Sequence, residues 1–77
     1  MGEEPLDEGQ RLRRLQMMLS MVQSVIAQSE ITIEEAAELA AAARRAALTL
    51  FPGKELAFDI LYKPRLQRLL QERFGLQ

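Results

Sequence analysis

The chain has 77 residues, of which 48% are hydrophobic, and its formal net charge is −1. A chain of this length forms at most one domain and buries only about 60% of the surface that its unfolded state exposes, so it lies near the lower limit of independent stability. The sequence contains no cysteine and no histidine, which excludes disulfides and nearly all zinc, haem and iron–sulfur sites and leaves oligomerisation as the stabiliser.

The first eight residues carry four acidic side chains, one glycine and one proline. This composition predicts a flexible acidic lead over residues 1–8, followed by a single helical domain over residues 9–77. Asp7 and Glu8 would lie favourably at the positive end of the first helix. An acidic start differs from a signal peptide, and no run of about 18 apolar residues could cross a membrane. We therefore expect a cytoplasmic protein.

Residues 11–27 have the spacing of an unusually apolar helix. A heptad seam with alternating steps of three and four residues is formed by Leu12, Leu15, Leu19, Val22 and Ile26. Three methionines and Val25 widen the apolar arc to about 220°, compared with roughly 100° for an ordinary surface helix. One neighbouring helix would not cover this arc. We therefore predict a helix to about residue 29 that needs covering on two sides.

The next helix begins with a capping box. The Thr32 hydroxyl can accept a hydrogen bond from the amide of Glu35, whose carboxylate can reach back to the amide of Thr32. We predict a helix over residues 33–50 that forms an antiparallel hairpin with the first helix. One narrow face of this helix carries only methyl groups and allows another helix to approach closely. Its members are Ala36, Ala40, Ala43 and Ala47.

Two proline-containing junctions organise the remainder of the chain. Residues 51–54 have the composition of a type II turn, in which Gly53 takes the position that requires a positive φ. We predict a short helix over residues 55–62 and a last helix over residues 64–74, with one continuous helix kinked at Pro64 as the alternative. Near this junction we expect Asp59 to form a clamp with Tyr62 or Arg65.

These elements predict an all-α fold, a small bundle of three to four helices in which a C-terminal helical pair folds across the antiparallel hairpin. Because the first helix is too apolar for one chain to cover, we expect a homodimer, with a homotetramer as the alternative. The predicted self-association interface consists of Leu12, Leu15, Met18, Leu19, Met21, Val22, Val25 and Ile26.

No set of residues indicates a catalytic, cofactor or metal site. Without histidine or cysteine, an enzyme would depend on carboxylates, lysine, arginine, tyrosine or serine. The sequence contains no P-loop, dinucleotide fingerprint or nucleophile elbow. We interpret the cluster of Glu34, Glu35 and Glu38 as capping and helix-dipole residues. The sequence thus predicts a non-enzymatic protein without a cofactor.

Charge is distributed unevenly along the chain. Residues 1–38 hold three arginines and eight acidic residues, a net charge of −5, whereas residues 39–77 hold seven basic and three acidic residues, a net charge of +4. We favour pairing between acidic and basic halves within or between chains. The leading hypothesis is a protein that self-associates and presents a helical surface to itself and to another protein.

The alternative function is a small dimeric nucleic-acid-binding regulator. It would contact phosphates through the basic side chains Lys63, Arg65, Arg68 and Arg73. The sequence favours this hypothesis less, because its pI of about 5.4 differs from the basic values typical of nucleic-acid-binding domains.

Overall fold

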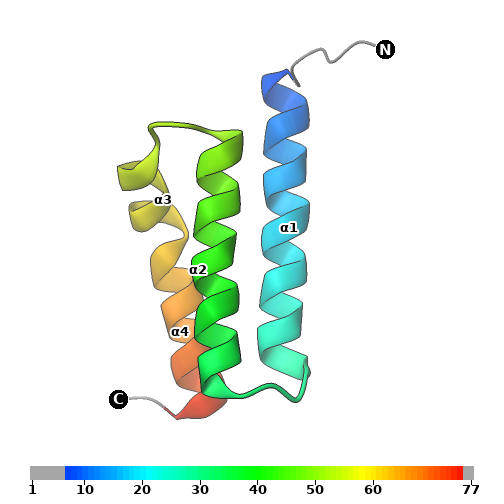
Figure 1. Cartoon of the computed structure of the whole chain (residues 1–77), viewed down its shortest axis with the longest axis vertical. Coiled ribbons are helices and arrows are strands. Elements are labelled where there is room, and N and C mark those ends of the chain that lie inside the picture. Colours follow the sequence, from blue (N-terminus) through cyan, green and yellow to red (C-terminus); the bar gives the residue numbers. More distant parts are fainter. Residues whose placement is uncertain (1–6, 76–77) are drawn as a thin grey trace.

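The computed structural model describes residues 7–75, which form four α-helices joined by short turns (Figure 1). The helices are α1 (Glu8–Gln28), α2 (Ile33–Leu50), α3 (Glu55–Leu61) and α4 (Lys63–Phe74). Residues 7–75 contain no strand, so the all-α prediction is confirmed. Residues 1–6 of the predicted acidic lead lie outside the described residues, whereas Asp7 and Glu8 belong to the start of α1.

Both long helices begin with a capping box. At α2 the Thr32 hydroxyl accepts from the Glu35 amide at 3.0 Å, and the Glu35 carboxylate accepts from the Thr32 amide at 2.9 Å, as predicted. At α1 the Asp7 carboxylate accepts from the Gln10 amide at 2.7 Å, and the Gln10 side chain accepts from the Asp7 amide at 3.2 Å. The prediction for Asp7 considered only the helix dipole, so this second box is a new finding.

The capping box of α2 gives a first testable prediction. We expect Thr32→Ala to lower the free energy of unfolding by about 1 kcal/mol, because the Glu35 amide loses its acceptor. Thr49 is a suitable control, since its hydroxyl donates only to the carbonyl of Arg45 on an exposed part of α2, and Thr49→Ala should change stability by less than about 0.5 kcal/mol. Urea unfolding at a fixed protein concentration would measure both; equal effects would contradict the capping role.

The core lies between α1 and α2 and is completed by α3 and α4. Its buried side chains, each at most 5% exposed, are Leu15, Leu19, Val22 and Ile26 of α1, Ala36, Ala43 and Ala47 of α2, Phe58 of α3 and Leu66 of α4. The small-residue face predicted on α2 is confirmed, because Ala40, its fourth member, is half-buried against the same core. The methyl groups allow close approach, and the larger side chains of α1 fill the space between the helices.

The two proline-containing junctions place α3 and α4 along the hairpin (Figure 1). Gly53 has a φ of 80°, and the Lys54 amide donates to the carbonyl of Phe51 at 3.3 Å, which closes the predicted turn. The backbone leaves ideal helical geometry at Tyr62 (φ −117°, ψ −32°), and α4 then begins with Pro64 in its first turn. The chain therefore forms two separate helices here. As a result α4 contacts both α1 and α2, whereas α3 contacts α2 and α4.

Asp59 pairs with Arg44 of α2, so the expectation that it would pair with Tyr62 or Arg65 is wrong. The Arg44 guanidinium donates from Nε to Oδ1 at 2.9 Å and from Nη2 to Oδ2 at 3.1 Å. This hydrogen-bonded pair lowers the pKa of Asp59 and raises the pKa of Arg44. The ring of Tyr62 instead packs against the ring of Phe58, with centroids 5.5 Å apart. The two hydrogen bonds between Arg44 and Asp59 therefore orient α3 against α2.

The ion pair predicts a component of stability that depends on pH. Because folding lowers the pKa of Asp59, the ionised carboxylate stabilises the folded state above its unfolded pKa of about 3.9, and this contribution disappears as the pH falls through the lower folded value. We expect Asp59→Asn to make the free energy of unfolding less dependent on pH between about 2 and 5. Arg44→Gln should do the same, and the double variant should add little, because both changes remove one interaction. An unchanged acid dependence would contradict this assignment.

Candidate interaction surfaces

The predicted self-association residues of α1 fall into two groups in the folded chain. Leu15, Leu19, Val22 and Ile26 are at most 5% exposed and belong to the core of their own chain. Leu12 is 43% exposed and Met21 is 61% exposed, whereas Met18 and Val25 are half-buried. The first group is covered by the other helices of the chain. Only the second group is accessible to another molecule in this fold.

The leucine and isoleucine side chains with the largest exposed fractions lie on α3. Leu56 is 71% exposed, Ile60 is 63% exposed and Leu61 is 59% exposed. In this helix only the side chain of Phe58 is buried, and Asp59 is turned toward Arg44. Within residues 7–75 the backbones of α1 and α3 do not approach each other closely, and the side of α3 that carries Leu56 and Ile60 is exposed. We call Leu12, Leu56, Ile60 and Leu61 the α3 surface.

An apolar groove of about 290 Å³ lies between α1 and α3, beside these exposed side chains. Leu12, Leu15, Phe51, Phe58 and Leu61 contribute to its walls, and Lys54 is the charged residue at its edge. Nearby, the guanidinium of Arg11 lies 5.4 Å from the centroid of the Phe51 ring. The α3 surface therefore combines protruding aliphatic side chains with an adjacent apolar recess.

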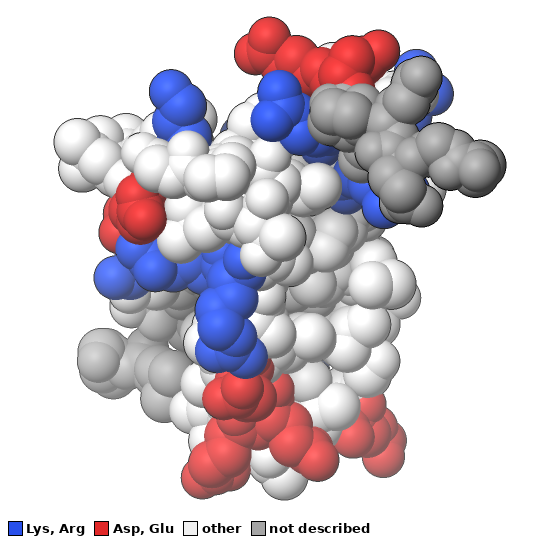
Figure 2. Space-filling view, turned by 45° about the horizontal axis from the view of Figure 1, so that its top comes forward, with Lys and Arg blue, Asp and Glu red and all other residues white. Residues whose placement is uncertain are grey.

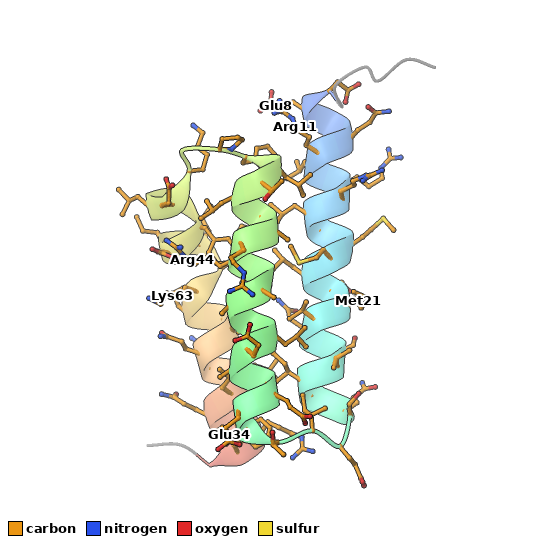
Figure 3. All side chains as sticks on the ribbon, in the orientation of Figure 1. Glu8, Arg11, Met21, Glu34, Arg44 and Lys63 are labelled. Atoms are coloured by element: carbon orange, nitrogen blue, oxygen red, sulfur yellow. The ribbon has the colours of Figure 1, made fainter. Side chains whose placement is uncertain are left out.

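A second region with exposed apolar side chains lies on the flank of α1, where Met18 is half-buried against the core and Met17 and Met21 are exposed. We call it the methionine surface and define it by Arg13, Arg14, Met17, Met18 and Met21. Met17 is 65% exposed and lies between a hollow of about 470 Å³ toward α2 and another of about 430 Å³ on the outer side of α1. Met21 lies on the side of α1 that points away from α2 (Figure 3). The excess apolar arc of α1 is thus only partly covered within the chain.

An exposed apolar surface on α3 was not predicted from the sequence, although the composition of this helix indicates one. Glu55 and Asp59 are its only polar residues and lie one helical turn apart, so five of its seven residues are apolar. A helix of this kind has apolar side chains on more than one side. A seven-residue helix can direct only a few of its apolar side chains into the core, and in α3 only Phe58 is buried.

The four basic residues considered for phosphate binding do not gather on one surface. Arg65 and Arg68 line a hollow of about 280 Å³ together with the carboxylate of Glu72. Lys63 lies near Asp59, where its charge helps to lower the pKa of that carboxyl. Arg73 donates from Nη2 to the carbonyl of Ser29 at 3.2 Å. On the face of the molecule drawn in Figure 2, lysine and arginine side chains in general lie at several separate places.

Within residues 7–75, no group of three or more acidic side chains is arranged to hold a metal ion. None of the helices in this part of the chain is both long and apolar enough to span a bilayer. Comparison of the chain with protein-family models, with curated proteins and with solved structures finds no match.

Proposed function

We propose that the chain is a non-enzymatic helical protein that forms a homodimer through the α3 surface and presents a second helical surface to another protein. The observation that carries this proposal is the exposure of 59 to 71% for the three large aliphatic side chains of α3. Contact between such side chains and water is unfavourable, and contiguous exposed apolar patches are typical of interaction sites. The absence of histidine and cysteine from the sequence supports a role without catalysis.

A second copy is the occupant that the shape of the α3 surface favours. Leu56 and Ile60 project from the same short helix that lines the apolar groove through Ala57, Phe58 and Leu61. In a two-fold symmetric interface the same patch serves both partners, so the protruding groups of each copy can meet the recess of the other. The groove has little charge besides Lys54, which limits the cost of removing it from water.

The expected affinity follows from the exposed side chains. Full burial of a leucine or isoleucine contributes about 1.5–3 kcal/mol, so the parts of Leu56, Ile60 and Leu61 that are still exposed would contribute about 6–12 kcal/mol over two copies. Association itself costs about 4–15 kcal/mol in lost freedom of motion. At the favourable end of these ranges the net gain is about 8 kcal/mol, which corresponds to a dimer that dissociates in the micromolar range.

Sedimentation velocity combined with light scattering tests the proposal. The chain has a mass of 8.8 kDa, and we expect the average mass to rise toward twice this value as the concentration increases from about 1 to 200 µM. A plateau at four times the monomer mass would indicate the tetramer. A constant monomer mass over the whole range would overturn the proposal.

A further inference from the structure

We infer that the methionine surface is a docking site for an acidic amphipathic helix of a different protein. This surface is separate from the α3 surface, because Leu12 and Met21 are nine positions apart on α1 and therefore lie about 180° apart around the helix. The two hollows beside Met17 share no lining residue with the groove between α1 and α3. A dimer formed through α3 would leave the methionine surface accessible.

The shape of the methionine surface suits a helix that lies along α1. The surface residues Arg14, Met17, Met18 and Met21 lie on neighbouring turns of α1, and together with the half-buried Val25, one turn beyond Met21, they cover a length of about 16 Å. The hollow toward α2 would receive apolar side chains from a partner helix of about three turns, whereas the outer hollow also offers the polar side chains of Gln16, Ser20 and Ser24. Methionine side chains are flexible and polarizable, so they adapt to side chains of different shape. Figure 2 shows the flank along α1, on the right of the view, as largely uncharged.

Charge selects an acidic partner and disfavours a second copy of the same surface. Arg13 lines the outer hollow and Arg14 lines the hollow toward α2, and among residues 7–75 no Asp or Glu lines either of them. In the described chain, side-chain ion pairs are made by Arg44 and Arg45 rather than by these two arginines. If two copies met through this surface, the arginines of one copy would face the arginines of the other, because the described residues of the hollows include no carboxylate to pair with them. A helix with glutamates beside its apolar stripe would supply the complementary charge.

The experiment uses two synthetic 18-residue helical peptides with the same leucine and phenylalanine stripe, flanked by glutamate in one and by lysine in the other. Carbon-13 labelled methionine methyl groups report binding to the full chain by NMR. We expect the acidic peptide to shift the methyl signals of Met17, Met18 and Met21 in a saturable manner, with weaker binding as salt is added. The lysine peptide should give no saturable shifts.

Variants separate charge recognition from non-specific apolar contact. Arg13→Glu combined with Arg14→Glu should weaken binding of the acidic peptide about tenfold or more, whereas the matched control Arg65→Glu with Arg68→Glu should leave it unchanged. A chain made monomeric by substitutions in α3 should bind as well as the unmodified chain. Equal binding of both peptides, loss of binding in the monomeric chain, or no effect of the Arg13 and Arg14 changes would overturn the inference. The comparison of the two peptides and the effect of the Arg13 and Arg14 changes do not depend on whether the chain dimerises.

Discussion

Replacing Leu56 and Ile60 together by glutamate is expected to convert the proposed dimer into a monomer at all accessible concentrations. Each dimer would lose four partly exposed aliphatic side chains from its interface, which removes about 4–8 kcal/mol of favourable burial. The new carboxylates would also face one another across the two-fold axis, where like charges repel. We expect the Kd for dimerisation to rise by at least about 1,000-fold. Light scattering at high concentration should then give only the 8.8 kDa mass.

The methionine surface offers a closely matched control for this experiment. Met17 and Met21 have the same spacing of four residues as Leu56 and Ile60 and similar exposures, 65% and 61% against 71% and 63%. The Met17→Glu, Met21→Glu variant therefore introduces the same charges at equally exposed positions and should remain a dimer. Circular dichroism should show unchanged helix content for both variants. If the α3 variant stays dimeric and the α1 variant becomes monomeric, self-association uses the methionine surface instead.

The parts of the fold that sequence analysis predicted correctly are determined by neighbouring residues. The capping box at Thr32 and Glu35, the positive φ of Gly53 and the interruption at Pro64 each depend on groups within about one helical turn. The alanine spacing of α2 also predicted a face that is indeed packed closely in the core. Such features follow from local geometry and do not require knowledge of which helices become neighbours.

The location of the exposed apolar surface was not predictable in the same way. The width of the apolar arc on α1 was evident, but only the placement of α2 and α4 determines that Leu15, Leu19 and Ile26 face the core while Met21 faces outward. The partner of Asp59 is Arg44, which is 15 residues away, whereas the sequence analysis considered only nearby partners. Tertiary contacts over such separations depend on the crossing of helices, which periodicity along one helix does not specify.

The assignment of Ile26 to the core rather than to an interface between copies can be tested directly. Ile26 is completely buried, so Ile26→Ala would leave a cavity and should cost about 3 kcal/mol. A domain of this size has a total stability of about 4–12 kcal/mol, and this single change would therefore remove a substantial part of it. Met21→Ala, on the same helix but 61% exposed, should change the free energy of unfolding by less than about 0.5 kcal/mol.

Urea unfolding of these variants in the chain made monomeric by the two α3 glutamates separates the two roles of Ile26. A core residue destabilises the monomer when it is truncated, because its contacts lie within one chain. An interface residue would change only the dissociation of the dimer, and its effect would disappear in the monomeric background. We expect the full loss for Ile26→Ala in that background. A loss no larger than that of Met21→Ala would mean that the α1 seam is covered by a second copy, and the division of α1 into a core side and an outer side would then be wrong.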